Sequence, residues 1–327
     1  MLNFLVFMYG IRILLTVAVM FCGIGSVMSA VTGEVNKETF VFAIEDGDTL
    51  RMDKYSDVAP EGGEPRPVVL FAFGGGFKGG DRATPSYVDF FHKLVKHGYT
   101  VVSTDYRTTL ASLVPEQIGS AETFVSLLQE AIATATVDFC RATRFVLEHS
   151  ESWHIAPDRI VACGSSAGAV TVLQAEYSLC QPDNPVRKLL PDDFRYAGII
   201  SFAGAIASAG QPEWEQAPCP ILLFHGDADR IVPYDKAVFD GVGLWGSYSI
   251  CQTLDRENLP HVFYSVNQAE HEMAERPMRE NLWEILAFLS RLNDESPMCI
   301  RHIKEQTKGM EIPAPKYSLE EYIKANL

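Results

Sequence analysis

The chain has 327 residues, a hydrophobic content of 47%, a charged content of 21% and a formal net charge of −15. This composition is typical of a folded globular protein and excludes a disordered chain, and the length suffices for one large α/β domain or two small ones. The negative charge and the lack of a dense Lys/Arg block argue against nucleic acid or an anionic membrane surface as a partner, because a phosphate backbone requires a basic patch.

Residues 1–30 differ from the rest of the chain. They carry one charge, Arg12, followed by an apolar run from Ile13 and by small residues up to Ala30. This pattern predicts a secretory signal peptide with cleavage near Ser29 or Ala30, and therefore a secreted or periplasmic protein. The uncharged stretch is also long enough for a membrane anchor that is not cleaved, which remains the alternative.

Six cysteines follow this segment at wide spacing: Cys140, Cys163, Cys180, Cys219, Cys251 and Cys299. No C-x-x-C pair occurs among them, which argues against a zinc site. Export would permit disulfides. The pairs Cys180–Cys219 and Cys251–Cys299 are both open from the sequence.

From residue 37 onward, apolar runs alternate with segments of helical pattern. The expected strands are 39–44, 50–55, 67–73, 100–106, 159–164, 196–202, 220–225 and 261–266. The expected helices are 86–97, 120–148, 167–180, 234–257 and 276–293. The alternation predicts an α/β fold with a mainly parallel central sheet and helices on both faces. The Glu-Asp-Gly-Asp between the first two runs predicts an antiparallel hairpin at the sheet edge.

The same pattern predicts one principal domain over residues 31–296 and a C-terminal extension, 297–327, packed on its outside. The extension contains a helix-start signal at 318–321 and is too short for a separate domain. Residues 204–217, which follow the sixth expected strand of the sheet, are too few for a cap domain. We therefore expect an open site.

The pentapeptide at 164–168, Gly-Ser-Ser-Ala-Gly, lies between an expected strand and an expected helix. This is the G-x-S-x-G pattern, in which a tight strand-to-helix turn exposes the central serine hydroxyl. Ser166 is therefore the candidate nucleophile. Small residues also cluster at ordinary helix N-termini, so the motif depends on the rest of the chain for support.

Three consecutive glycines, 74–76, follow the strand expected at 67–73. Glycines at such a place let backbone N–H groups approach a ligand, as an oxyanion hole requires. A Walker phosphate loop would need Gly-Lys-Ser/Thr, which residues 77–80 do not supply, and the G-x-G-x-x-G spacing of a dinucleotide site is also missing. An ordinary glycine-rich turn is the remaining alternative.

A serine nucleophile needs a base and a carboxylate that orients the base. Asp229 lies in the loop after the strand expected at 220–225, with Asp227 as the fallback. His271 lies in the loop after the last expected strand and completes the chain order Ser, Asp, His. His261 begins a strand, where it would point into packing, and ranks second.

Taken together, these residues resemble the α/β-hydrolase superfamily, and within it carboxylesterases with an HGGG-type oxyanion loop. The resemblance covers residues 38–293 and rests on five motifs in order: Gly74-Gly75-Gly76, Asp105-Tyr106-Arg107, Gly164–Gly168, His225-Gly226 with Asp229 and Val232-Pro233, and His271. It implies that Ser166, Asp229 and His271 form a catalytic triad and that the amides of Gly75, Gly76 and Ala167 form the oxyanion hole.

Two positions depart from the pattern of those esterases. Phe73 stands where the histidine before the glycines is usual, and Ser165 stands where an aspartate usually precedes the nucleophile. Neither position belongs to the triad. The departures leave the subfamily open.

The resemblance implies a serine esterase that needs no metal and no organic cofactor. An open site on an exported protein suits bulky esters, such as acetyl or feruloyl esters of glycans. We expect its walls to come from residues 107–119 and the segment around Trp214, with Trp245 as a further candidate, although both tryptophans also fit as packing residues. A lipase, a prolyl-oligopeptidase-like peptidase and an inactive hydrolase-fold binding protein remain as alternatives.

Overall fold

The computed structural model of the protein describes residues 34–57, 63–113, 120–239, 242–292, 300–306 and 312–326. The predicted signal peptide and Cys299 lie outside these residues. Within them, no helix combines the length and the apolar character needed to cross a membrane.

A nine-stranded sheet forms the centre of the molecule, in the order β1-β2-β4-β3-β5-β6-β8-β11-β12. β1 pairs antiparallel with β2, and β2 pairs antiparallel with β4, while every pair from β4 to β12 is parallel. The strands are β1 (Asn36–Glu45), β2 (Asp48–Ser56), β3 (Arg66–Ala72), β4 (Thr100–Thr104), β5 (Ile155–Ser165), β6 (Gly198–Phe202), β8 (Ile221–Gly226), β11 (His261–Val266) and β12 (Arg301–Glu305). The predicted fold class, with its antiparallel edge hairpin, is confirmed.

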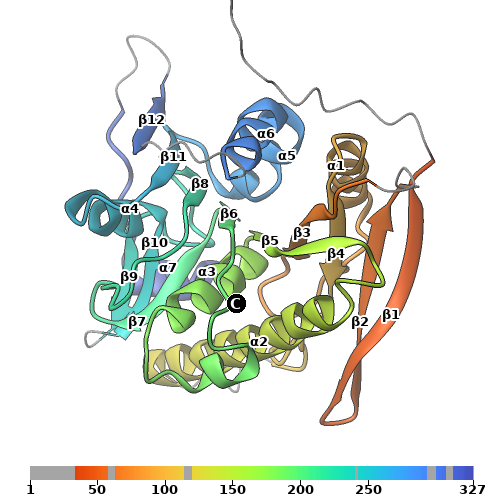
Figure 1. The fold of residues 1–327 in the computed structure, drawn as a ribbon. Coiled ribbons are helices and arrows are strands. Elements are labelled where there is room, and N and C mark those ends of the chain that lie inside the picture. Colours follow the sequence, from red (N-terminus) through yellow and green to blue (C-terminus); the bar gives the residue numbers. More distant parts are fainter. Residues whose placement is uncertain are drawn as a thin grey trace, which may run out of the picture.

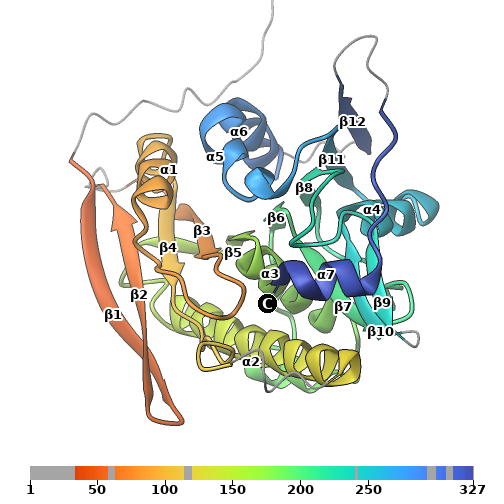
Figure 2. The same ribbon diagram turned by 180° about the vertical axis from the view of Figure 1, so that it is seen from behind.

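Helices cover both faces of this sheet, as Figures 1 and 2 show from opposite sides. α1 lies together with α5 and α6 on one face, and α2 packs against α3 on the other. The helices are α1 (Pro85–Lys96), α2 (Ala121–Glu148), α3 (Ala167–Leu179), α4 (Ser247–Arg256), α5 (Arg276–Glu280), α6 (Leu282–Arg291) and α7 (Leu319–Asn326), with 3₁₀ turns η2 (Pro185–Leu189) and η3 (His271–Ala274). The Ser120 hydroxyl caps α2 by accepting from the amide of Thr123.

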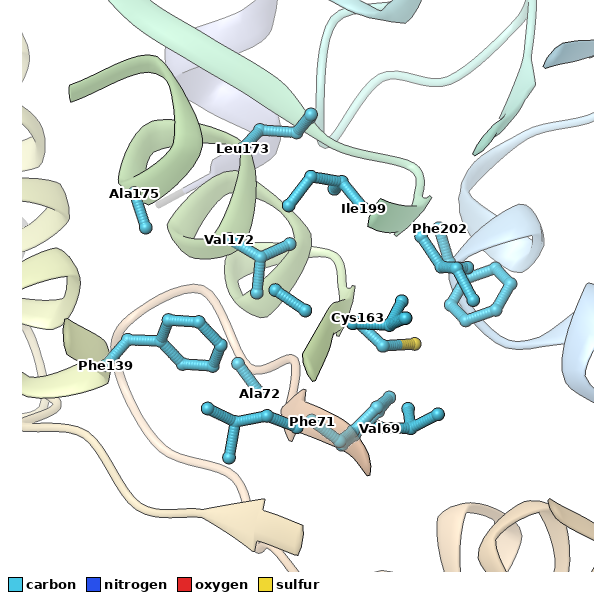
Figure 3. Close-up of a cluster of buried hydrophobic side chains, with 14 of the residues drawn as sticks. Val69, Phe71, Ala72, Phe139, Cys163, Val172, Leu173, Ala175, Ile199 and Phe202 are labelled. Carbon is cyan, nitrogen blue, oxygen red and sulfur yellow. The ribbon is translucent and has the colours of Figure 1, made fainter. Parts of the chain in front are cut away.

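The core lies on both faces of the middle strands: Phe71 and Phe202 pack against α1, and Phe139 of α2 lies on the opposite side with α3 (Figure 3). Phe71 of β3, Phe202 of β6 and Phe139 of α2 are fully buried, as is Cys163 of β5. Burying each large apolar side chain contributes about 1.5–3 kcal/mol. This packing fixes the carboxyl ends of β3 and β5, from which the loops of the site emerge.

The structure corrects two predicted elements. The helix expected over 276–293 is divided into α5 and α6, which are separated by Asn281. The segment 234–257, expected to be a single helix, contains β9 (Lys236–Phe239) and β10 (Val242–Gly246) before α4 begins. These strands join β7 (Ala205–Ala209) in a second, antiparallel sheet of order β7-β10-β9. Hydrogen bonding to β7, far away in the chain, overrides the weak local helical pattern.

The C-terminal residues do more than pack on the surface. β12 extends the central sheet by pairing with β11, which the sequence analysis did not predict. Further on, the Tyr317 hydroxyl donates to the carbonyl of Ala228 (3.2 Å), and the Asn326 amide donates to the carbonyl of Ile231 (3.1 Å). Residues 312–326 therefore contact the loop that contains Asp229.

Candidate active site

Ser166 occupies the turn between β5 and α3 and has the backbone angles φ 52° and ψ −119°. A positive φ is strained for any residue except glycine. The turn is also crowded, because a Cβ on Gly168 would lie 2.1 Å from the carbonyl oxygen of Ala72. The small residue of the motif thus lets α3 approach β3, while the turn exposes the Ser166 hydroxyl to the cleft described below.

The His271 ring bridges this hydroxyl and a carboxylate. Its Nε2 lies 2.8 Å from Ser166 Oγ, and its Nδ1 lies 2.7 Å from Asp229 Oδ2. Because an ionised carboxylate only accepts hydrogen bonds, Nδ1 is the ring atom that carries the proton. Nε2 is then the atom able to accept the proton of the serine hydroxyl.

Asp229 is buried and held by its own loop. Its Oδ1 accepts from the amides of Ile231 (2.8 Å) and Val232 (3.0 Å), which leaves Oδ2 to face His271. Burial would raise the pKa of the Asp229 carboxyl, but hydrogen bonds from His225 and His271 outweigh burial and hold this pKa well below its usual range. The group is therefore a carboxylate at neutral pH.

The alternative residues lie elsewhere. Asp227 accepts from the amide of Gln268 (2.6 Å) and the side chain of Asn267 (2.7 Å), so it braces the turn that leads to His271. His261 is buried at the start of β11 and contacts neither Ser166 nor Asp229. The structure brings together the three residues ranked first.

The glycine loop faces the same cleft. Gly75 has φ 141° and Gly76 has φ 62°, and a Cβ on Gly75 would lie 2.1 Å from the carbonyl oxygen of Gly79. Among the described residues, the amides of Gly75, Gly76 and Ala167 have no acceptor. Ala167 is the first residue of α3, where the helix dipole favours negative charge. The arrangement can bind an oxyanion beside Ser166.

The chain is similar to proteins named as esterases or lipases. A family model described as BD-FAE matches residues 52–130. Lipase 2 of Moraxella sp. (strain TA144) is 28% identical over 211 residues, which cover 58% of this chain and 43% of that protein. The chain thus spans less than half the length of this relative.

Solved structures match over most of the chain. Esterase 2 of Thermogutta terrifontis, phosphoramylated by tabun, superposes with a TM-score of 0.57 at 18% identity and covers 80% of this chain and 96% of that one. Its propionate-bound form gives 0.55 at 19% identity, with 81% and 97% covered. The chain has the α/β-hydrolase fold. The fold-level resemblance predicted from the sequence motifs is therefore confirmed.

A hydroxyl network links the loops around the candidate nucleophile. The Tyr87 hydroxyl accepts from the amide of Gly74 (3.3 Å) and donates to Ser165 Oγ (3.2 Å), which donates to the carbonyl of Ala274 (2.9 Å). Ser165, the departure noted in the motif, thus connects the glycine loop with the segment that follows His271. Tyr87 belongs to no motif, so the sequence analysis did not single it out.

The other departure, Phe73, also has a structural role. Its ring stacks on Tyr106 with centroids 4.5 Å apart, and the Tyr106 hydroxyl donates to the Phe73 carbonyl (2.8 Å). Both side chains are almost fully buried. The pair fixes the start of the glycine loop without a histidine at position 73.

The cleft over Ser166 has a volume of about 590 Å³ and is open to solvent. One wall comes from the glycine loop and α1, including Tyr87, and the other from residues 271–279. Four charged side chains line the second wall: Glu272, Glu275, Arg276 and Arg279. The sequence analysis expected residues 107–119 to form part of the walls, but no described residue of this loop lines the cleft.

The two tryptophans also lie away from the cleft. Trp214 is 8% exposed and packs edge-on against Tyr177, with ring centroids 5.3 Å apart. Trp245 is equally buried on β10 and donates to the Ser208 carbonyl (3.4 Å). Both act as packing residues, and neither is among the residues that line the cleft. Cys180 and Cys219, one of the two pairs considered for a disulfide, are free thiols.

Proposed function

We propose that this protein is a serine carboxylesterase in which Ser166, His271 and Asp229 form the catalytic triad. The proposal depends on one observation above all. The His271 ring is hydrogen-bonded through Nε2 to the Ser166 hydroxyl and through Nδ1 to the Asp229 carboxylate. This division of the two ring nitrogens is the arrangement that makes a serine hydroxyl nucleophilic at neutral pH.

In the proposed reaction, Ser166 Oγ attacks the ester carbonyl while His271 Nε2 takes its proton. Asp229 stabilises the imidazolium, and the amides of Gly75, Gly76 and Ala167 bind the oxyanion, each such donor contributing about 3 kcal/mol to the barrier reduction. The imidazolium then protonates the leaving alcohol. Water, deprotonated by His271, hydrolyses the acyl-enzyme and frees Ser166.

We further propose that the substrate is a short or aromatic acyl ester of a bulky polar alcohol, such as an acetyl or feruloyl ester of a glycan. The open cleft and the four charged side chains of its second wall support this class. A long alkyl chain would need an apolar channel, since its burial against charged groups gains little. The name of Lipase 2 keeps lipids as the competing class.

The triad is tested with Ser166→Ala. We expect kcat on p-nitrophenyl acetate to fall on the order of 10⁶-fold and a fluorophosphonate probe to stop labelling the protein, while circular dichroism stays unchanged. Ser152→Ala, a change of an exposed serine, serves as the matched control and should leave both readouts intact. Labelling of the Ser166→Ala protein would place the nucleophile elsewhere, and no labelling of the unmodified protein would favour an inactive binding protein.

The substrate class is tested with an ester panel on the purified protein. We expect kcat/KM to fall as the acyl chain of p-nitrophenyl esters lengthens from acetate to octanoate, and acetyl-xylan to release acetate. A preference for octanoate would identify a lipase. Faster cleavage of a prolyl p-nitroanilide than of any ester would identify a peptidase.

We also propose that the protein is exported, because residues 1–30 have the pattern of a signal peptide. The structure does not describe these residues. Expression of the full chain followed by N-terminal sequencing tests the proposal. A mature protein that begins near residue 30 is expected, whereas retention in the membrane fraction with residues 1–30 intact would indicate an anchor.

A further inference from the structure

A second histidine cluster lies at the opposite end of the sheet from the β1–β2 hairpin, where α4 packs against β11 (Figure 1). Cys251 and Asp255 stand one helical turn apart on α4, and His261 is the first residue of β11. Cys251 Sγ lies 3.3 Å from His261 Nε2 and 3.6 Å from Asp255 Oδ2. His261 Nε2 lies 3.3 Å from Asp255 Oδ1. Each of the three residues thus offers a potential ligand atom within 4.8 Å of those of the other two.

The cluster contains the residue types of a cysteine nucleophile, but its geometry excludes that role. In a nucleophilic triad the nucleophile and the carboxylate contact different nitrogens of the histidine, as Ser166 and Asp229 do with His271. Here Cys251 and Asp255 both approach Nε2 of His261. No carboxylate then contacts the other ring nitrogen to stabilise an imidazolium, and the thiol is almost fully buried from any substrate.

Convergence on one nitrogen is instead the geometry of a metal site. Zinc binds thiolate at about 2.3 Å, imidazole at about 2.0–2.1 Å and carboxylate at about 2.0–2.2 Å, and tetrahedral angles then place neighbouring ligand atoms roughly 3.3–3.6 Å apart. In the cluster, Cys251 Sγ and Asp255 Oδ1 each lie 3.3 Å from His261 Nε2, and Sγ lies 3.6 Å from the other carboxylate oxygen, Asp255 Oδ2. One ligand atom from each of the three residues lies within 4.8 Å of the other two. A tetrahedral cation therefore fits between these atoms without rearrangement of the backbone.

The remaining ring nitrogen supports this role. His261 Nδ1 lies 2.8 Å from the carbonyl oxygen of Leu259, which can only accept a hydrogen bond. Nδ1 therefore carries the proton, and Nε2 presents its lone pair to the cluster. A backbone carbonyl on the distal nitrogen is the usual outer partner of a metal-bound histidine.

The site is also accessible. His261 is fully buried, but the Asp255 side chain is 48% exposed, so a cation can enter from that side. A water molecule can complete the tetrahedron there. Cys251 itself is almost fully buried beside His261.

We propose that Cys251, Asp255 and His261 form a binding site for a zinc-like divalent cation that ties α4 to β11. The mixed thiolate, imidazole and carboxylate set favours Zn²⁺ over the hard cations Mg²⁺ and Ca²⁺, which prefer oxygen ligands alone. The wide cysteine spacing hid this site from the sequence analysis, because the C-x₃-D-x₅-H pattern matches no common zinc motif. The site lies outside the catalytic cleft and does not depend on the esterase proposal.

The test uses the tag-free, chelator-treated protein and two cations, Co²⁺ and Zn²⁺. One equivalent of CoCl₂ should produce the near-ultraviolet thiolate-to-cobalt charge-transfer absorption, and ZnCl₂ should displace it with 1:1 stoichiometry. Cys251→Ser should abolish this absorption. No thiolate absorption at one equivalent of Co²⁺ would overturn the proposal.

Asp255→Asn keeps the test decisive if the buried cysteine variant fails to fold, because residue 255 is exposed. We expect Zn²⁺ affinity to fall at least tenfold, since even loss of an outer partner lowers metal affinity 10- to 100-fold. Glu257→Gln, a change of a neighbouring carboxylate beyond the end of α4, is the matched control and should change affinity less than twofold. Equal weakening by both variants would show a nonspecific charge effect and would also overturn the proposal.

Discussion

The clusters at His271 and His261 each bring a histidine together with an aspartate and with a hydroxyl or thiol, and they differ in how the ring is used. At His271 the two partners occupy opposite nitrogens, whereas at His261 both partners occupy one nitrogen. At His271, Nε2 can take the proton of the Ser166 hydroxyl while Asp229 stabilises the charged ring. At His261, the thiol, the ring nitrogen and the carboxylate direct their lone pairs toward one position, where a cation can bind. Residue types alone therefore do not define the chemistry, because the atom that each partner contacts decides it.

The two clusters also differ in their backbone. Ser166 has a strained positive φ at the end of a strand, while Cys251 lies within the regular helix α4. Strain is found where a reactive group must project from the chain. A cation site needs only rigid elements that hold its ligands in place.

The largest predicted difference is in activity. Asp229→Asn should lower kcat about 10⁴-fold, because the wrong tautomer of His271 then faces Ser166. Asp255→Asn should leave kcat within twofold, since Asp255 does not belong to the proposed catalytic triad. Initial rates on p-nitrophenyl acetate measure both. Similar losses in the two variants would remove the distinction between the clusters.

The next effect is on thermal stability. Zinc at one hundred times its Kd should stabilise the fold by about 2.7 kcal/mol, which raises Tm by roughly 5–11 °C, while kcat stays within twofold. Differential scanning calorimetry with and without a chelator measures the shift. Cys251→Ser should remove the response to zinc, and an undiminished response in that variant would locate the cation elsewhere.

A smaller effect concerns the strain at the nucleophile. Ser166→Gly should abolish turnover yet raise the free energy of unfolding by about 1 kcal/mol, because glycine adopts φ 52° without strain. The change in Tm should be roughly 2–4 °C. Cys251→Ser, measured without zinc, should give no such gain. A lower Tm for Ser166→Gly would mean that the serine hydrogen bond outweighs the strain.

The smallest effect is on the pH dependence of stability. The folded-state pKa of Asp229 is lowered, so its contribution is fully present above the unfolded pKa of about 3.9 and is lost as the pH falls through the folded value. Urea unfolding from pH 7 to pH 3 should therefore show a stability gap between the unmodified protein and Asp229→Asn that is constant down to about pH 4 and narrows below it. A gap that narrows between pH 7 and pH 5 would contradict the lowered pKa.

The proposed triad of Ser166, Asp229 and His271 could be predicted from the sequence because each of these residues follows a strand that is recognisable by itself. Ser166 comes after a buried apolar run, and Asp229 and His271 follow two further runs of the same kind. The carboxyl ends of parallel strands meet at one edge of the sheet, so the positions of these residues in the chain determine their meeting place. Predicting the strands was therefore enough to bring these residues together.

The rest depends on contacts that the sequence does not display. β9 and β10 are short strands that exist because β7 pairs with β10, and nothing in their own pattern excludes a helix. The cleft walls come from α1 and residues 271–279, whose side-chain directions follow from packing. The cluster at His261 depends on how α4 docks against β11, which local periodicity does not determine.

The contacts of residues 312–326 have a practical consequence for work with this protein. The Asn326 amide donates to Ile231, which lines the cleft, and the Asn326 carbonyl accepts from Lys78 beside the glycine loop (2.6 Å). A bulky group attached at Asn326 would therefore disturb its contacts with both of these loops. Purification handles and immobilisation points belong instead on the β1–β2 hairpin at the other side of the sheet, where Asp46 and Gly47 form an exposed turn.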